Sequence, residues 1–290
     1  LEGVILNVDF LKNCGMGKAT GMGKKVIVLG GGNVAFDCAR SAKRLGAEEI
    51  HVACLEAREH MTADEEEIQQ AVEEGIMIHP AQTFERITGT GHVTGVDFMN
   101  VKSFTFDENH RAVIHREENS EHHIEADTVI FAVGQRPDIT EEAGLALGRG
   151  NSIAVRDIET DKATSVDGIF AAGDAIYGTK SVIMAIESGR EAAAQIDQYL
   201  GGNGDISEKL APEQKPDAYI GICEGFGYMQ RKNRCIDSPE SRCNNFELFD
   251  HGICDSDICA EAGRCLQCDL RLQISKPRVW GDYAEGKEEK

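Results

Sequence analysis

The sequence has no long hydrophobic run and no basic N-terminal segment. No apolar stretch approaches the roughly 18 to 20 residues needed to cross a bilayer, and the opening residues LEGVILNVDF lack the basic start of a signal peptide. We therefore expect a globular cytoplasmic protein without membrane insertion. The chain begins with Leu1 in place of Met, which favours an N-terminally truncated protein.

Positive charge is also scarce. The chain has 30 Lys and Arg residues and 50 Asp and Glu residues, which gives a formal net charge of -20. Binding to a phosphate backbone needs a cationic surface. The composition therefore excludes nucleic acid and anionic membrane surfaces as expected partners.

Cysteine is sparse in most of the chain and crowded near its end. Most of the ten cysteines fall after residue 222, at Cys223, Cys235, Cys243, Cys254, Cys259, Cys265 and Cys268. A secreted disulfide scaffold would distribute its cysteines more evenly. In a reducing compartment a cluster of this kind indicates metal or iron–sulfur ligation.

A strand, a tight turn and a helix are predicted near the N-terminus. Lys24 to Leu29 (KKVIVL) is an apolar, β-branched run, and residues 33–45 have the apolar spacing of a helix. Gly46 closes that helix, and Ile50 to Leu55 then predicts a second strand. Together these segments predict a βαβ unit.

Further segments extend this α/β pattern. We expect a helix over 63–74, a short strand over 76–79, a β-meander over 84–125, a buried strand over 127–133 and a helix over 181–200. The residues from 201 to 217 form a polar linker that contains Gly and Pro. These boundaries divide the chain into segments 3–125, 126–201 and 202–290.

The turn after the first predicted strand has the spacing of a dinucleotide-binding fingerprint. Glycines in this motif allow a tight turn, and a bound pyrophosphate rests on the N-terminus of the following helix. An acidic residue at the end of the second strand accepts a hydrogen bond from a ribose hydroxyl. The candidate NAD-binding residues are Gly30, Gly31, Gly32, Asn33, Val34, Ala35 and Glu56.

A second nucleotide motif lies later in the chain. Residues 168–175 read GIFAAGDA, the closing half of an FAD site, in which Gly173 lets the backbone approach the cofactor and Asp174 accepts hydrogen bonds. No opening half of such a site precedes it in this chain. We therefore expect the missing N-terminal FAD segment to be part of the same protein or of another chain.

Several ordered motifs resemble the small subunit of glutamate synthase and its FAD-dependent pyridine-nucleotide oxidoreductase relatives. They are KKVIVLGGGNVAFDCARSAKRLGA, EHMTADEEEIQQAVEEGI, DTVIFAVGQRPD and GIFAAGDAIYGTKSVIMAIESGREAA. The resemblance covers residues 3–200. It implies a Rossmann-like NAD-binding domain inserted in a partial FAD-binding domain and followed by a Cys-rich tail.

The resemblance also assigns residues around the flavin. Asp174 would hold the ribitol or phosphate region, and the helix that starts near Ser181 and Val182 would point its positive end toward the flavin. Gly134 would lie at the crossover between the two domains. Hydride transfer depends on stacking and distance, so no catalytic side chain is expected.

One position departs from the family pattern. The glutamate synthase subunits resemble one another in carrying paired arginines where this chain has Leu55 and Glu56. A carboxylate repels the 2′-phosphate of NADPH, so the sequence favours NADH. Arg58 lies nearby and is the residue that could weaken this preference.

The end of the tail contains a candidate metal site. The segment RCLQCD resembles the iron–sulfur segments of the same family, and four thiolates suffice for one 4Fe-4S cluster. Their spacing matches no standard set, so zinc or a cluster shared with another chain stays open. The candidate ligands are Cys254, Cys259, Cys265 and Cys268.

These features predict an NADH-dependent FAD oxidoreductase subunit. Electrons would pass from NADH through FAD to an iron–sulfur centre and then to a redox partner subunit. One alternative is a non-catalytic electron relay or scaffold, like the flavin-bearing subunit of heterodisulfide reductase. A bare NAD-binding module without flavin is a third possibility.

Overall fold

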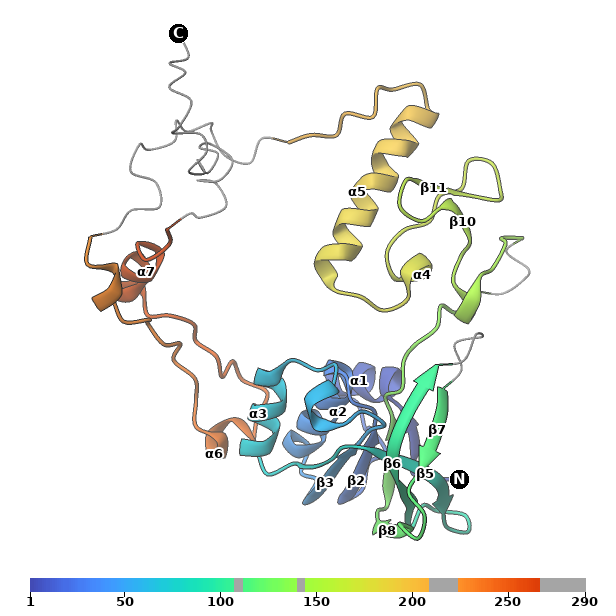
Figure 1. The fold of residues 1–290 in the computed structure, drawn as a ribbon, viewed down its shortest axis with the longest axis vertical. Helices are drawn as coiled ribbons and strands as arrows, with labels where there is room; N and C mark the ends of the chain where they lie inside the picture. The colour runs from blue at the N-terminus through green and yellow to red at the C-terminus, as the bar shows by residue number, and fades with distance from the viewer. Residues whose placement is uncertain (107–111, 140–143, 209–223, 267–290) are drawn as a thin grey trace, which may run out of the picture. The chain divides into compact units, whose positions relative to one another are not determined.

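The computed structural model describes residues 1–106, 112–139, 144–208 and 224–266 (Figure 1). The chain divides into two compact units. Unit 1 contains Leu1–Ser207 and Pro239–Phe246, whereas unit 2 contains Glu208–Ser238 and Glu247–Lys290. A short segment of the predicted tail therefore belongs to the first unit.

A parallel sheet of five strands forms the centre of unit 1. All its neighbouring strands run in the same direction, as expected for a doubly wound α/β domain. In spatial order the strands are β1 (Val4–Leu6), β9 (Thr128–Phe131), β2 (Lys25–Leu29), β3 (Glu49–Ala53) and β4 (Met77–His79). The strand β9 lies beyond the sequence boundary at residue 125, so this sheet uses residues from both sides of it.

Helices cover one face of this sheet (Figure 1). They are α1 (Asn7–Gly15), α2 (Asn33–Arg44) and α3 (Glu65–Glu73), and a one-turn 3-10 helix (Arg58–His60) precedes α3. Buried side chains of the helices, including Phe10, Phe36 and Ile68, pack against apolar side chains of the strands. Removal of this apolar surface from water is the main stabilising contribution to the layer.

An antiparallel meander covers the other face. Its strands are β5 (Gln82–Thr88), β6 (Gly95–Phe106), β7 (Ala112–Arg116) and β8 (His122–Glu125). The strand β6 pairs with each of the other three. Val96 and Phe98 of β6 are buried in one cluster with Ile27 and Val129 of the central sheet. The predicted β-meander is therefore confirmed.

The segment from 144 to 207 contains the elements of the second motif. They are a 3-10 helix (Arg149–Asn151), the antiparallel pair β10 (Val155–Asp157) and β11 (Asp161–Thr164), the short helix α4 (Asp174–Tyr177) and the long helix α5 (Val182–Tyr199). Only Ser188 and Ala192 of α5 are buried. The apolar side chains Val182 and Ile183 at its start are 78% and 72% exposed.

The tail contributes one anchored segment to unit 1. In this segment the helix α6 (Pro239–Arg242) places Arg242 against the end of α3. The Arg242 guanidinium contacts Glu74 and Glu73, each at 2.8 Å. The Glu74 side chain is fully buried and also pairs with Arg40 and Arg44 of α2. This cluster joins α2, α3 and the tail segment.

Unit 2 is small within the described residues. It contains a 3-10 helix (Phe226–Tyr228) and the helix α7 (Asp255–Ala262). An isolated antiparallel bridge joins Ile236 to Asp250. None of the helices described in either unit is long and apolar enough to span a membrane.

Candidate functional site

Three strands end together at one edge of the central sheet. Leu29, the last residue of β2, is in register with Ala53 of β3 and with Phe131 of β9. The segments that follow these strands therefore meet at the same edge. In open α/β sheets this carboxyl edge is where ligands bind.

The glycines of the turn after β2 are required by close packing. Gly30 has a φ of 142°, and a Cβ there would lie 2.4 Å from the carbonyl oxygen of Ala132. A Cβ on Gly31 would lie 2.9 Å from the Cβ of Cys54 and 3.0 Å from a carboxylate oxygen of Glu56. Any side chain at Gly30 or Gly31 would collide with the segments that follow the neighbouring strands.

The helix α2 starts at this turn without a side-chain cap. Gly32 is its N-cap, and no acidic residue occupies the first turn. The N–H groups at the start of a helix lack partners within the helix, and the helix dipole makes this end positive. The first turn, which includes Asn33, Val34 and Ala35, is therefore suited to an anion such as a pyrophosphate.

A loop beside the turn is fixed to α2 by hydrogen bonds. The amide nitrogen of Asn33 donates to Asp64 at 3.0 Å, and the backbone N–H of Asp64 donates to the Asn33 side-chain oxygen at 2.8 Å. The backbone N–H of Ala63 donates to the Gly31 carbonyl at 3.1 Å. These bonds hold residues 57–64 next to the start of α2.

Replacing Asn33 with alanine should lower the free energy of unfolding by about 1 kcal/mol, because two side-chain hydrogen bonds are lost at an exposed position. Urea denaturation followed by circular dichroism measures the change. Gln69→Ala is the matched control, since the Gln69 amide donates a hydrogen bond to Glu73 on the exposed side of α3. An equal loss of stability in both variants would contradict this role of Asn33.

Glu56 lies close to the glycine turn, as the sequence predicts. Its carboxylate oxygen is the atom that a Cβ on Gly31 would meet. Arg58, the cation nearest to it in sequence, forms an ion pair with Glu65 at 2.6 Å. Cys54 is buried between these segments, and burial raises the pKa of its thiol to about 12. This buried thiol therefore packs as a small apolar group.

The remaining predicted residue at this edge is Gly134. It follows β9 and has a φ of 101°, a conformation that favours glycine. A Cβ at this position would meet no atom within 4 Å. A glycine is therefore favoured at position 134 by the backbone conformation. The role of Gly134 in cofactor binding stays a prediction.

The residues of the second motif gather around the start of α5. Gly173 has a φ of 64°, and its N–H donates to the hydroxyl of Ser188 at 3.1 Å. Asp174 accepts a hydrogen bond from the backbone N–H of Lys180 at 3.4 Å. Ser181 caps α5 by accepting from the N–H of Met184, and Val182 is exposed beside it. The structure thus brings Asp174, Ser181 and Val182 to one end of the helix.

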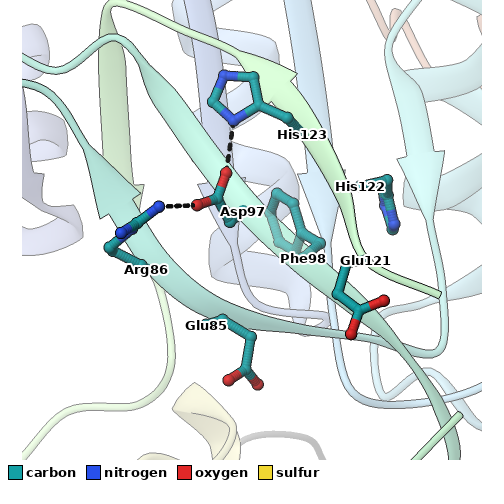
Figure 2. Close-up of a pocket in the computed structure, with 7 residues that line it drawn as sticks. All are labelled: Glu85, Arg86, Asp97, Phe98, Glu121, His122 and His123. Atoms are coloured by element: carbon teal, nitrogen blue, oxygen red, sulfur yellow. Dashed lines mark hydrogen bonds and ion pairs between the residues drawn. The ribbon is translucent and has the colours of Figure 1, made fainter. Parts of the chain in front are cut away.

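Two cavities lie away from the candidate cofactor residues. A hollow of about 610 Å³ lies on the meander. Figure 2 shows its lining, in which Arg86 and His123 both bind the carboxylate of Asp97. A second cavity of about 530 Å³ lies beside β11 and α5, near Gly168 and Tyr199. None of the candidate cofactor residues lines either cavity.

The candidate metal ligands do not form a cluster in the described residues. Cys254, Cys259 and Cys265 are exposed, and Cys268 lies outside the described part of the chain. No group of three or more His, Cys, Asp or Glu side chains that could hold a metal was found in that part. Instead, the Cys254 sulfur lies 3.3 Å from that of Cys235, a residue absent from the predicted ligand set.

The parallel sheet and its glycine turn define an α/β nucleotide-binding protein. Residues 1–189 match the pyridine nucleotide-disulphide oxidoreductase family, and the chain belongs to this family. The resemblance to that family is therefore confirmed. Members are oxidoreductases that use a pyridine nucleotide and a flavin.

Characterised relatives span longer chains. The NADP(+)-dependent formate dehydrogenase subunit beta of Moorella thermoacetica is 32% identical, over 92% of this chain and 39% of its own length. The NADPH-Fe(3+) oxidoreductase subunit beta of Geobacter sulfurreducens is 30% identical, over 90% of this chain and 44% of its own length. The glutamate synthase [NADPH] small chain of Azospirillum brasilense is 35% identical, over 68% of this chain and 41% of its own length. This chain thus spans about two fifths of the length of these relatives.

Solved structures show the same fold. Thioredoxin reductase of T. acidophilum has a TM-score of 0.51 and 23% identity, over 68% of this chain and 57% of that chain. FprA of Mycobacterium tuberculosis in complex with NADPH has a TM-score of 0.54 and 14% identity, over 69% of this chain and 59% of that chain. At these identities the likeness supports the fold alone.

Proposed function

We propose that this chain is the nucleotide-binding part of an electron-transfer subunit that oxidises NADH through FAD and supplies a redox partner. The observation that carries the proposal is the edge where the Gly30–Gly32 turn, the uncapped start of α2 and the Glu56 carboxylate meet. This combination offers one site for a pyrophosphate and one acceptor for ribose hydroxyls. The relatives are named as subunits, which supports a partner.

The residues of this edge would bind and orient the dinucleotide. The first-turn N–H groups of α2 would hold the pyrophosphate, and Glu56 would accept from the adenosine ribose. The nicotinamide supplies the hydride and the flavin accepts it when both are bound. The protein's contribution is to fix the position of the reacting rings, so this proposal assigns no acid or base.

The nucleotide preference rests on Glu56. The relatives' names specify NADP(+) or NADPH, but this chain places a carboxylate beside the turn and pairs Arg58 with Glu65. A 2′-phosphate close to Glu56 would meet a like charge. We therefore propose NADH as the preferred donor for this protein.

Replacing Glu56 with glutamine should weaken that preference. The amide keeps a hydrogen-bond acceptor but removes the charge, so NADPH should bind about tenfold more tightly, equivalent to about 1.4 kcal/mol. Isothermal titration calorimetry with NADH and NADPH measures both affinities. Glu59→Gln is the control for removing a negative charge nearby in sequence. Unchanged NADPH affinity in Glu56→Gln would show that this carboxylate does not select the nucleotide.

The flavin site would be completed by residues outside this chain. Asp174, Ser181 and Val182 form one end of such a site, where the positive N-terminus of α5 would face the flavin. The exposed apolar start of α5 supports this proposal, since contiguous exposed apolar surface marks a binding surface. We propose that the flavin and an FAD-binding segment absent from these 290 residues cover it.

The route beyond the flavin is a separate hypothesis. The described residues do not assemble a metal site. The proposed electron path therefore includes no metal centre in this part of the chain. A 4Fe-4S cluster at Cys254, Cys259, Cys265 and Cys268 stays a prediction that depends on Cys268. Iron analysis with an absorbance band near 400 nm would support a cluster, whereas zinc is colourless.

Anaerobic mixing of NADH with the FAD-loaded protein, prepared with its FAD-binding segment present, tests the proposed activity. We expect rapid bleaching of the flavin absorbance, because hydride transfer reduces the flavin. A protein that binds FAD and NADH without bleaching would be a non-catalytic relay, and the proposed NADH oxidation would be wrong. A protein that includes this segment and binds NADH but retains no FAD would be a bare nucleotide-binding module.

A further inference from the structure

Two cysteines of unit 2 lie within contact distance. The sulfur atoms of Cys235 and Cys254 are 3.3 Å apart, although the residues are 19 positions apart in sequence. Both side chains are exposed to solvent. Their sulfurs can therefore react with each other and with a dissolved reagent without prior unfolding.

The backbone around the pair holds this geometry. The N–H of Cys235 donates to the Gly252 carbonyl at 2.7 Å, and the N–H of His251 donates to the Cys235 carbonyl at 2.8 Å. The adjacent Ile236 forms an antiparallel bridge with Asp250. The strand-like segment that bears Cys235 is thus fixed beside the segment that leads into Cys254.

A second set of contacts fixes the same segment to α7. The Lys232 ammonium pairs with Asp257 at 3.1 Å, and the backbone N–H of Lys232 donates to Glu261 at 2.8 Å. Cys254 is the N-cap of this helix. The two cysteines are therefore positioned by contacts on both sides of the pair, and the pairing does not depend on the thiols alone.

We propose that Cys235 and Cys254 are a redox-active pair that forms a reversible disulfide by exchange with a low-molecular-weight disulfide. The sulfur separation favours this over joint metal ligation. Two thiolates on one tetrahedral metal, with metal–sulfur bonds of about 2.3 Å, lie about 3.8 Å apart. The ligands of a 4Fe-4S cluster bind different irons and lie farther apart still. The disulfide and the predicted cluster both use Cys254, so they exclude each other, and the metal-binding test below distinguishes them.

The exchange consists of two successive displacement reactions, each of which releases one small thiolate. One of the two cysteines attacks one sulfur of the small disulfide as its thiolate, a mixed disulfide forms, and one small thiolate leaves. The other cysteine then loses its proton to that thiolate or to water and attacks the protein sulfur of the mixed disulfide, which releases the second small thiolate. Two protein thiols are oxidised to one disulfide, and one small disulfide is reduced to two thiols.

Peptide mapping after equilibration in glutathione buffers tests the pair. The protein is incubated with mixtures of oxidised and reduced glutathione, trapped with N-ethylmaleimide and digested. We expect a peptide that links Cys235 to Cys254 in oxidising mixtures and its full loss in reducing ones. Oxidised protein without this peptide, or with Cys254 linked equally to Cys259 or Cys265, would overturn the proposal.

Three variants make the test specific. Cys235→Ser and Cys254→Ser should each stop at a mixed disulfide between glutathione and the remaining cysteine of the pair, because the second displacement is then impossible. Cys259→Ser is the matched control, because Cys259 is also an exposed free cysteine of α7, and it should form the link as the unmodified protein does. Iron or zinc that binds stoichiometrically and is lost from both Cys235→Ser and Cys254→Ser would show a metal site and contradict the disulfide. Flavin reduction by NADH is unaffected by either result, so the two proposals fail independently.

Discussion

Replacing Glu74 with alanine should lower the free energy of unfolding of unit 1 by about 3 to 5 kcal/mol, the usual cost of breaking a buried ion pair. The fully buried carboxylate is the shared partner of Arg40, Arg44 and Arg242. The variant leaves these guanidinium groups close together without their common counter-charge. Urea denaturation followed by circular dichroism measures the loss.

An exposed ion pair provides the control for this experiment. Glu48 pairs with Lys24 at 3.1 Å, and both side chains are mostly exposed. Glu48→Ala should change the free energy of unfolding by less than about 1 kcal/mol, as is typical of surface pairs. Similar losses in Glu48→Ala and Glu74→Ala would contradict the structural role assigned to the buried cluster.

The same cluster makes stability sensitive to acid. Burial raises the pKa of Glu74, but the hydrogen bonds from Arg40 and Arg44 outweigh burial and hold it below the ordinary value of 4.5. A carboxyl group with a lowered folded-state pKa contributes its stability above the unfolded-state pKa. This contribution should be complete above about pH 5 and should be lost as the pH falls below about 4.5. Glu74→Ala should lose less stability than the unmodified protein over that range.

Replacing Gly30 with alanine should destabilise unit 1 by about 2 to 4 kcal/mol and abolish NADH binding. The new Cβ would lie 2.4 Å from the Ala132 carbonyl oxygen, and the φ of 142° is strained for alanine. Because that oxygen belongs to the backbone after β9, relief requires the turn to move away from the sheet. Thermal unfolding and calorimetric titration with NADH measure the two effects.

Gly15→Ala is the matched control for the glycine prediction. Gly15 ends α1, and a Cβ there would meet no atom within 4 Å. This variant should retain NADH binding and change stability by less than about 1 kcal/mol. A Gly30→Ala variant that binds NADH normally would show that the close approach in this turn is not needed for the site.

The βαβ unit was predictable because its signals are local. The run before Gly30 becomes β2 (Lys25–Leu29), and the expected helix over 33–45 is α2 (Asn33–Arg44). By contrast, the three-residue run of β1 carries too few residues to predict a strand, and its pairing with β9 joins residues far apart in sequence. Local patterns give the elements next to the turn, whereas the edge strand depends on tertiary pairing.

Contacts between distant charges and thiols were not predictable from the sequence. Arg242 and Glu74 are 168 positions apart, and no local pattern distinguishes this arginine from solvated ones. The spacing of the last cysteines pointed to Cys254 as a metal ligand, but Cys235, its neighbour in space, lies outside that spacing. The apolar spacing of α5 predicted the helix correctly, yet it could not show that Val182 and Ile183 are exposed.

Comparison of NADH and NADPH affinity by isothermal titration calorimetry tests the central claim most directly. The claim is that the Gly30–Gly32 turn, the start of α2 and Glu56 form an NADH site. We predict that NADH binds at least about tenfold more tightly than NADPH, equivalent to about 1.4 kcal/mol, and that Gly30→Ala abolishes this binding. Tighter binding of NADPH, or NADH binding that survives in Gly30→Ala, would contradict the account.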